Sequence, residues 1–270
     1  MEVYYQIISV FTSKEFNYKG NPAAVLLLEN HLSRAAMQEM ARKLNQPAST
    51  FLVKRTGGHG YDIRWFAPDA EIGLCGHGTA AATAFLGIKE QSNGPFTFNY
   101  RDGKLTGKVN PDQTVTIGAN AILIQGELEE IPLPIKEGLN VPILGMFKTS
   151  NKYLILTDSE ESVKNMQPDF NRLQDSDIFG YAVTAKGDNV DFVSRTIVPH
   201  TLGKEDYATG SSHAMLVPFW AEKLNKQHMK AVQLSSRGGA FLCGLKHGVV
   251  ELTGEFLIEE KQKISVPMGI

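Results

Sequence analysis

The sequence feature that most constrains the fold is a helix pattern with small or apolar residues on every side, and it occurs twice. In the first copy, the turn Cys75-Gly76-His77-Gly78-Thr79 runs directly into Ala80-Ala81-Ala82-Thr83-Ala84-Phe85-Leu86. In the second, Thr209-Gly210-Ser211-Ser212-His213 runs into Ala214-Met215-Leu216-Val217-Pro218-Phe219-Trp220. A helix that is apolar all round is buried rather than lying on a surface. Each copy therefore needs a sheet that curls around it.

Strand patterns precede and follow both helices. Stretches rich in β-branched and aromatic residues predict strands in the first half at 3–11, 23–28, 50–54, 61–66, 96–99, 104–109 and 114–117. The same reasoning predicts strands in the second half at 153–157, 180–185, 190–196, 230–234, 241–245, 248–253 and 255–260. A further helix is expected at 34–44, with Ser33 as its N-cap and an apolar face formed by Met37, Met40, Ala41 and Leu44.

The spacing of the two buried helices indicates a duplicated unit. Gly76 and Gly210 lie 134 residues apart, about half of the 270-residue chain. The composition changes after Gly118, and the segment 126–142 is rich in Glu, Pro and Leu, as expected for a crossing between domains. We therefore predict an N-terminal domain at 1–118 and a C-terminal domain at 119–270. The last strand either stays in the second domain or returns to the first.

Charge and hydropathy exclude several classes of partner. The net charge is −2 and no basic run occurs, so nucleic acid is not expected as a partner. The longest apolar runs fall short of the roughly 18 residues that a membrane span requires, so no membrane partner is expected. The start of the chain lacks the basic region of a signal peptide. The two cysteines, Cys75 and Cys243, are too few for a disulfide framework, and a cytoplasmic location is expected.

Five motifs, in order along nearly the whole chain, together resemble the PhzF-like (phenazine biosynthesis-like) family. They are Gly20-Asn21-Pro22-Ala23-Ala24-Val25, Arg64-Trp65-Phe66-Ala67-Pro68-Asp69-Ala70-Glu71, Cys75-Gly76-His77-Gly78-Thr79, the stretch from Glu205-Asp206 to His213, and Ser236-Arg237-Gly238-Gly239. The resemblance implies an α+β, diaminopimelate epimerase-like fold: two similar domains, each a β-barrel wrapped around a central helix, with the active site in the cleft between them. It also implies a cofactor-free isomerase that acts on a small carboxylic acid, often as a homodimer.

One departure from the family pattern bears on the chemistry. The family carries a proton-transferring glutamate in a pattern like Ser-Glu-Thr-Ala-Phe, and the aligned stretch here is Pro47-Ala48-Ser49-Thr50-Phe51. Ala48 thus stands where the glutamate belongs, and a methyl group cannot carry a proton. General acid–base catalysis typically contributes about 10²–10⁴-fold to a rate. The alternative to an active isomerase is a catalytically impaired homologue that binds a small molecule or a protein.

The remaining candidates for proton transfer are His77 and Asp206. His77 stands at an expected helix N-terminus and is either a proton carrier or a capping side chain. Asp206 either acts on protons or caps the helix that begins near Gly210. Because helix N-termini bind anions, backbone N–H groups at Gly76, Gly78, Gly210 and Ser211 are candidates to bind a substrate carboxylate. Asn21 is a further substrate-binding candidate.

For the other residues with reactive or titratable side chains, a structural role is an alternative to a catalytic one. The distant epimerases of this fold use two cysteines, but the position matching Cys75 in the second half is Thr209, which disfavours a two-thiol racemase. Cys243 is expected in the core. Glu71 either replaces the missing glutamate or, more simply, anchors the turn before Cys75. His213 either positions Asp206 or only packs. The histidines show no metal-ligand spacing, and no metal is expected.

Overall fold

The computed structural model describes residues 2–56, 60–259 and 261–267. Residues 57–59, including His59 in the loop expected between two strands, lie outside this description. The chain divides into two compact units, one formed by Met1–Ala119 with Thr253–Ile270 and the other by Asn120–Leu252. None of the described helices is long and apolar enough to cross a membrane.

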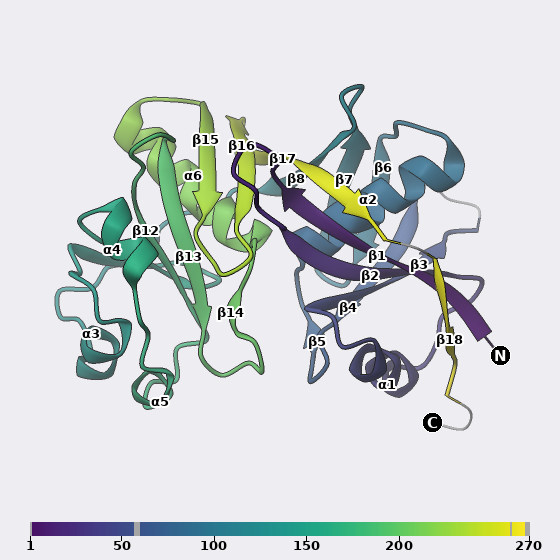
Figure 1. The fold of residues 1–270 in the computed structure, drawn as a ribbon, viewed down its shortest axis with the longest axis horizontal. Coiled ribbons are helices and arrows are strands. Elements are labelled where there is room, and N and C mark those ends of the chain that lie inside the picture. Colours follow the sequence, from purple (N-terminus) through teal and green to yellow (C-terminus); the bar gives the residue numbers. More distant parts are fainter. Residues whose placement is uncertain (1, 57–59, 260, 268–270) are drawn as a thin grey trace. The chain divides into compact units, whose positions relative to one another are not determined.

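Unit 1 is a ring of strands closed by the C-terminal part of the chain (Figure 1). Antiparallel partners of β1 (Glu2–Thr12) are β2 (Asn21–Leu28), β17 (Val249–Ile258) and β18 (Gln262–Ser265). From β2 the ring continues through β3 (Ala48–Lys54), β4 (Tyr61–Phe66), β6 (Phe96–Tyr100), β7 (Gly103–Val109) and β8 (Thr114–Asn120). The pairing of β8 with β17 closes it. The short β5 (Glu71–Ile72) adds to β4.

The helix α2 (Gly76–Glu90) lies inside this ring. It packs against β1, β2, β3, β6 and β7, and most of its residues are buried on every side, as the sequence predicts. The helix approaches the strands closely, because a Cβ atom placed on Gly107 of β7 would lie 2.0 Å from Thr83 Oγ1. Only a residue without a side chain fits at that point.

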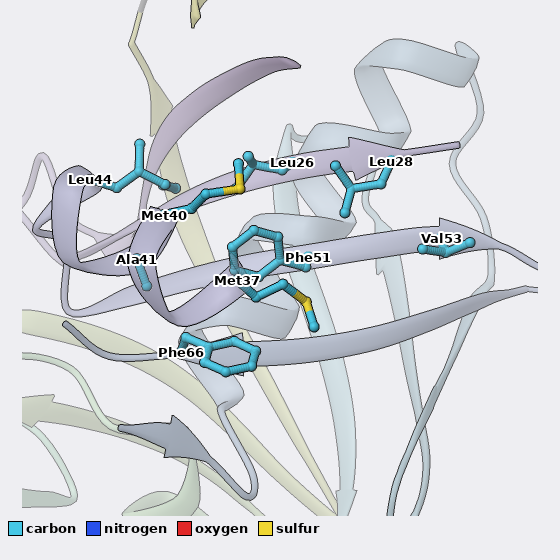
Figure 2. Close-up of a cluster of buried hydrophobic side chains, with 10 residues drawn as sticks. Leu26, Leu28, Met37, Met40, Ala41, Leu44, Phe51, Val53 and Phe66 are labelled. Carbon is cyan, nitrogen blue, oxygen red and sulfur yellow. The ribbon is translucent and has the colours of Figure 1, made fainter. Parts of the chain in front are cut away.

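A second layer covers the opposite face of the sheet in unit 1. The helix α1 (Arg34–Leu44) begins after Ser33, whose hydroxyl accepts from the Ala36 N–H at 3.1 Å, as the sequence predicts. Figure 2 shows Met37 and Met40 of α1 directed toward Phe51 and Leu26 of the sheet, in one buried cluster with Phe66. Burying a side chain of this size contributes about 1.5–3 kcal/mol, so this face stabilises the pairing of α1 with β3 and β4.

Unit 2 repeats the arrangement of strands around a buried helix. Its strands are β9 (Gly126–Glu127), β10 (Gly145–Lys148), β11 (Tyr153–Leu156), β12 (Tyr181–Lys186), β13 (Phe192–Val198), β14 (Lys204–Asp206), β15 (His228–Gln233), β16 (Gly239–Lys246) and the start of β17. The helix α6 (Gly210–Leu224) packs against β12, β15 and β16. Three short helices lie outside this sheet: α3 (Leu133–Leu139), α4 (Glu160–Asn165) and α5 (Phe170–Leu173).

The two central helices correspond to each other, as the sequence repeat indicates. Each has 15 residues and each follows an extended N-cap residue, Cys75 for α2 and Thr209 for α6. Each ends at a C-cap residue in the left-handed conformation, Gln91 and Asn225. Equivalent starts and ends of the central helices, with three strands directly before each helix and three directly after it, confirm two similar domains, each built around one helix.

Two sequence expectations about the chain path differ from the structure. The segment 126–142, expected as a plain crossing, contains the helix α3. The two strands expected at 248–253 and 255–260 are one strand, β17. Its residues 255–258 pair with β1, and Thr253, on the other side of Gly254, contacts Thr116 of β8, so partners on both sides of the glycine keep the strand continuous. The end of the chain, Thr253–Ile270, belongs to unit 1. The sequence predicted a second domain at 119–270 and left open whether its last strand returns to the first.

Candidate functional site

The candidate residues of unit 1 lie at the N-terminal turn of α2. Cys75 caps this helix, and its Sγ accepts from the Gly78 N–H at 3.4 Å. The same sulfur lies 3.5 Å from Nδ1 and 3.8 Å from Nε2 of His77. Both side chains are buried. The structure therefore places the Cys75 thiol and the His77 imidazole in contact, and it is the thiol that caps α2.

The capping contact changes the expected role of one glycine. The Gly78 N–H, which was expected to donate to a substrate carboxylate, donates to Cys75 Sγ in this structure, and its contact with a substrate stays a prediction. Gly78 has a second role in packing, because a Cβ atom there would lie 2.6 Å from Trp65 Cδ1 and 2.8 Å from Thr50 Oγ1. Gly76, the first residue of α2, is only partly buried and remains a candidate donor at this end of the helix.

Ala48 faces the interior of the ring near this turn. Along β3, Phe51 and Val53 belong to the cluster under α1, whereas Thr50 lies with its Oγ1 3.4 Å from the carbonyl oxygen of Gly78 in α2. Because successive side chains of a strand point to opposite faces, Ala48 shares the face of Thr50. Ala48 is fully buried and lies opposite Ala23 of β2. The residue aligned with the family glutamate therefore points from β3 toward α2, inside the ring of strands.

Asn21, the predicted substrate contact, is the fully buried first residue of β2. Its position depends on the turn before it. Gly20 has φ +62°, and a Cβ atom there would lie 2.2 Å from the Val10 carbonyl oxygen, so the turn requires glycine. The contact of Asn21 with a substrate stays a prediction.

The candidate residues of unit 2 lie in a polar network before α6. Thr209 does not cap this helix with its side chain. Its hydroxyl donates instead to Asp206 Oδ2 at 2.7 Å. Gln233 of β15 fixes both residues, since its Nε2 donates to the Asp206 carbonyl oxygen at 2.5 Å and its Oε1 accepts from the Thr209 N–H at 2.8 Å. The Asp206 carboxylate is thus held beside the N-terminus of α6.

A buried lysine strengthens the positive charge at the same helix end. Lys152 is 5% exposed, and its Nζ donates to Ser211 Oγ at 2.9 Å and to Asn151 Oδ1 at 2.7 Å. A helix N-terminus carries partial positive charge, so the ammonium group and the start of α6 together favour an anion near Ser211. Lys152 was not among the residues predicted from the sequence, because a single lysine between two strands carries no pattern, and only tertiary packing places it beside α6.

Three further residues near these helix ends make contacts within their own units. Glu205 forms a two-bond ion pair with Arg195 inside unit 2, at 2.8 Å for each bond. Glu71 anchors the turn before Cys75, as the simpler reading predicts, by accepting from Arg34 and Arg64 at 2.8 Å. His213 donates from Nδ1 to the Thr209 carbonyl oxygen at 2.9 Å and stacks on Phe241.

Two further observations concern the second cysteine and possible metal ligands. Cys243 is buried in unit 2, and burial raises the pKa of its thiol. Among residues 2–56, 60–259 and 261–267, no group of three or more His, Cys, Asp or Glu side chains is arranged to hold a metal ion. The expected meeting of His77 and Asp206 in one cleft joins residues of different units and stays a prediction.

Comparison with known proteins identifies relatives over nearly the full length. The family model described as "Phenazine biosynthesis-like protein" matches residues 8–256. An uncharacterized isomerase of Pseudomonas aeruginosa is 33% identical over 265 residues, which cover 98% of this chain and 99% of that protein. A crystal structure of a PhzF family phenazine biosynthesis protein from Enterococcus faecalis has a TM-score of 0.87 and 35% identity, covering 98% of this chain and 100% of that one.

A more distant structural neighbour agrees on the fold. A hydroxyproline epimerase from Agrobacterium vitis has a TM-score of 0.64 at 9% identity, covering 97% of this chain and 92% of that one. At this identity the likeness concerns architecture alone. Together with the barrel and the two buried helices, it confirms the expected diaminopimelate epimerase-like fold.

Proposed function

Because the chain belongs to the phenazine biosynthesis-like protein family, we propose that it is a cofactor-independent isomerase or epimerase that moves a proton on a small carboxylate-bearing metabolite. The observation that carries this proposal is the pair of equivalent buried helices, each with a proton-carrying side chain at its start. His77 lies two residues after the cap of α2, and Asp206 lies three residues before the cap of α6.

In this proposal the substrate carboxylate binds at the start of α6. The backbone there, at Gly210 and Ser211, receives no cap from the Thr209 side chain, and Lys152 adds an ammonium group on Ser211. Fixing the carboxylate there makes the adjacent C–H bond more acidic, because positive charge stabilises the enolate-like species that forms when the proton leaves. Asn21 and Gly76 are the proposed contacts from unit 1.

The proton leaves carbon to one of the two carriers and returns from a carrier to another carbon or to the other face, so that the substrate is isomerised without net change in composition. His77 suits this work since a histidine exchanges protons near neutral pH. The Thr209 hydroxyl holds the Asp206 carboxylate in one orientation. Ala48 contributes nothing to the transfer. We further propose that the protein acts in the cytoplasm as a homodimer, as the resemblance implies.

The proposal is tested by the incorporation of solvent deuterium into a panel of small α-amino and α-hydroxy acids, followed by proton NMR. The parent protein should exchange deuterium into at least one compound. His77→Ala should reduce that rate by about 10²-fold or more, because the loss removes general acid–base catalysis. Cys75→Ala, which removes the capping thiol beside the same imidazole, is the matched control and should keep most of the rate. Equal rates in the parent and His77→Ala contradict the assignment.

Ala48 favours a second candidate, an isomerase scaffold that binds its ligand without chemistry. It is a fully buried methyl group at the aligned position of the family glutamate, on the strand face that points to α2. Under this alternative, the parent binds a small carboxylic acid and exchanges no deuterium, whereas Ala48→Glu begins to exchange it. Exchange by the parent itself removes the alternative.

A further inference from the structure

Unit 1 contains a cavity of about 510 Å³ on the face of its sheet opposite α2. Its apolar part is formed by Leu28, Met37, Phe51 and Val53, which belong to the cluster under α1 shown in Figure 2. Small-molecule sites typically have volumes of about 300–1,000 Å³ and are lined mainly by apolar side chains. The cavity therefore has the size and the apolar lining that are typical of a ligand site. Neither of the proposed proton carriers, His77 and Asp206, lines it.

The rim of this cavity is charged, and positive groups predominate among the described residues. Its lining contains the guanidinium groups of Arg34, Arg64 and Arg101 but only two carboxylates, those of Asp62 and Glu71. Both Arg34 and Arg64 bind the single carboxylate of Glu71. Two guanidinium groups that share one carboxylate retain one positive charge between them, so the rim can accept one more carboxylate.

Neighbouring charges do not cancel this excess. Asp62 is bound by His31 at 3.2 Å and by Arg55 at 3.6 Å. Arg101 is bound by Asp102 at 3.0 Å. With Arg55 and Asp102 included, four guanidinium groups still face three carboxylates among the described residues. The Arg34 side chain is 72% exposed, so it can turn toward a ligand at low cost.

We propose that this cavity binds a monoanionic small molecule with an apolar body, of the class of medium-chain carboxylic acids. The apolar body lies on Met37, Phe51 and Val53, and the carboxylate lies at Arg34 and Arg64. This site is separate from the proposed reaction site, because Thr50 and Ala48, which alternate with Phe51 along β3, face α2. The inference does not depend on the proposed function.

Trp65 provides an indirect signal of occupancy, because it belongs to the lining of the cavity but its ring packs on the α2 side of β4, where a Cβ atom on Gly78 would lie 2.6 Å from Trp65 Cδ1. The chain has two tryptophans, and only Trp65 lines the cavity, with its ring 5.6 Å from that of Tyr100. Trp220 lies in α6 of unit 2. In a Trp220→Phe variant, all tryptophan fluorescence comes from Trp65. Titration with octanoate should give a saturable change in this fluorescence, and calorimetry should confirm the binding. The affinity for octanoate should be at least about tenfold higher than the affinity for octylammonium, because the positive rim repels an ammonium group. Octanol, with the same chain and no charge, should fall between them.

Three substitutions in the same Trp220→Phe background distinguish the contribution of the charged rim to ligand binding from that of the apolar lining. Arg34→Met should weaken octanoate binding about fivefold, in the range of a partly exposed charge contact, and leave octanol binding unchanged. The matched control is Arg172→Met in unit 2, which likewise removes a partly exposed arginine from ion pairs, here with Glu137 and Asp175, and should change neither affinity. Val53→Phe should weaken octanoate and octanol together by filling the apolar part of the cavity.

The proposal is overturned if octanoate gives neither a saturable signal nor heat, or if octylammonium binds as tightly as octanoate. It is also overturned if Arg34→Met and Arg172→Met behave alike. Should Val53→Phe fail to fold, Arg34→Met and the three ligands of equal chain length decide the question alone.

Discussion

At the scale of single residues, the two N-caps show how one change of side chain alters a helix end. Cys75 and Thr209 take the same place before α2 and α6 with nearly the same backbone conformation. The thiol accepts from the first turn of its own helix, whereas the hydroxyl donates to Asp206 and leaves its helix uncapped by a side chain. The start of α6 is therefore the better place for an anion from outside the protein.

His213 gives a prediction at this scale. Burial lowers its pKa from 6.5 to about 4, although its contact with the Thr209 carbonyl oxygen acts in the opposite direction. The unfolded chain, with the ordinary pKa, binds more protons than the folded chain between these values. The contribution of neutral His213 to stability is thus complete above pH 6.5 and falls as the pH drops toward 4. At pH 5 the loss relative to pH 7 should be roughly 2 kcal/mol.

The measurement is urea unfolding of the parent and of His213→Phe at pH 7 and pH 5. Phenylalanine keeps the stacking on Phe241 and removes the titrating group, so the variant should lose less stability between the two pH values. His228→Gln, at an exposed position of β15, is the control and should keep the parent's pH dependence. An equal pH dependence in His213→Phe and the parent contradicts this explanation.

At the scale of elements, α1 and α2 are held by different means. α1 is amphipathic and rests one apolar face on the sheet, so a periodic pattern of large side chains specifies it. α2 has mainly small residues from Gly76 to Ala84, and this part of the helix is held by close approach of its backbone to the ring. Glycines at the contact points, Gly78 on the helix and Gly107 on β7, make that approach possible.

The close approach predicts a large effect from one added methyl group. Gly78→Ala would place a Cβ atom 2.6 Å from Trp65 Cδ1 and 2.8 Å from Thr50 Oγ1, both on the buried wall. Overpacking of this kind costs about 1–3 kcal/mol, more than the roughly 1 kcal/mol that alanine gains over glycine in a helix. Urea unfolding should show the net loss. Gly126→Ala, where no atom lies within 4 Å of the new Cβ, should leave stability within about 0.5 kcal/mol of the parent.

At the scale of the whole molecule, unit 1 is completed by the end of the chain. β1, at the start, pairs with β17 along Ile8–Thr12 and with β18 along Glu2–Tyr5. The Thr116 and Thr253 hydroxyls, from β8 and β17, lie 2.7 Å apart in the same unit. The ring closes only after the chain has formed unit 2, so the first unit depends on contacts between residues more than 200 positions apart.

A truncated chain tests this dependence. A chain that stops after Leu252 lacks residues 255–258 of β17 and all of β18, so one edge of β1 is left unpaired and exposes its backbone groups and apolar side chains. Unit 1 should lose at least roughly 3 kcal/mol of stability or fail to fold. Single-tryptophan variants separate the units, because Trp65 lies in unit 1 and Trp220 in unit 2. Unfolding reported by Trp65 should change more than unfolding reported by Trp220. A chain that stops after Pro267 is the control and should match the parent, and identical Trp65 curves in both truncations contradict the prediction.

The sequence by itself determined the features that depend on neighbouring residues. The bounds of α1, the all-round burial of α2 and α6, their spacing and most strands follow from local periodicity and caps, and the family motifs identify the fold. Tertiary structure alone decided the features made by distant residues. These are α3 within the crossing and β17 as one strand that pairs with both β1 and β8. They also include the burial of Lys152 against Ser211 and the cavity whose charged rim comes from four separate segments. Contacts of this kind leave no periodic pattern, because each depends on where the ring brings the chain back to itself.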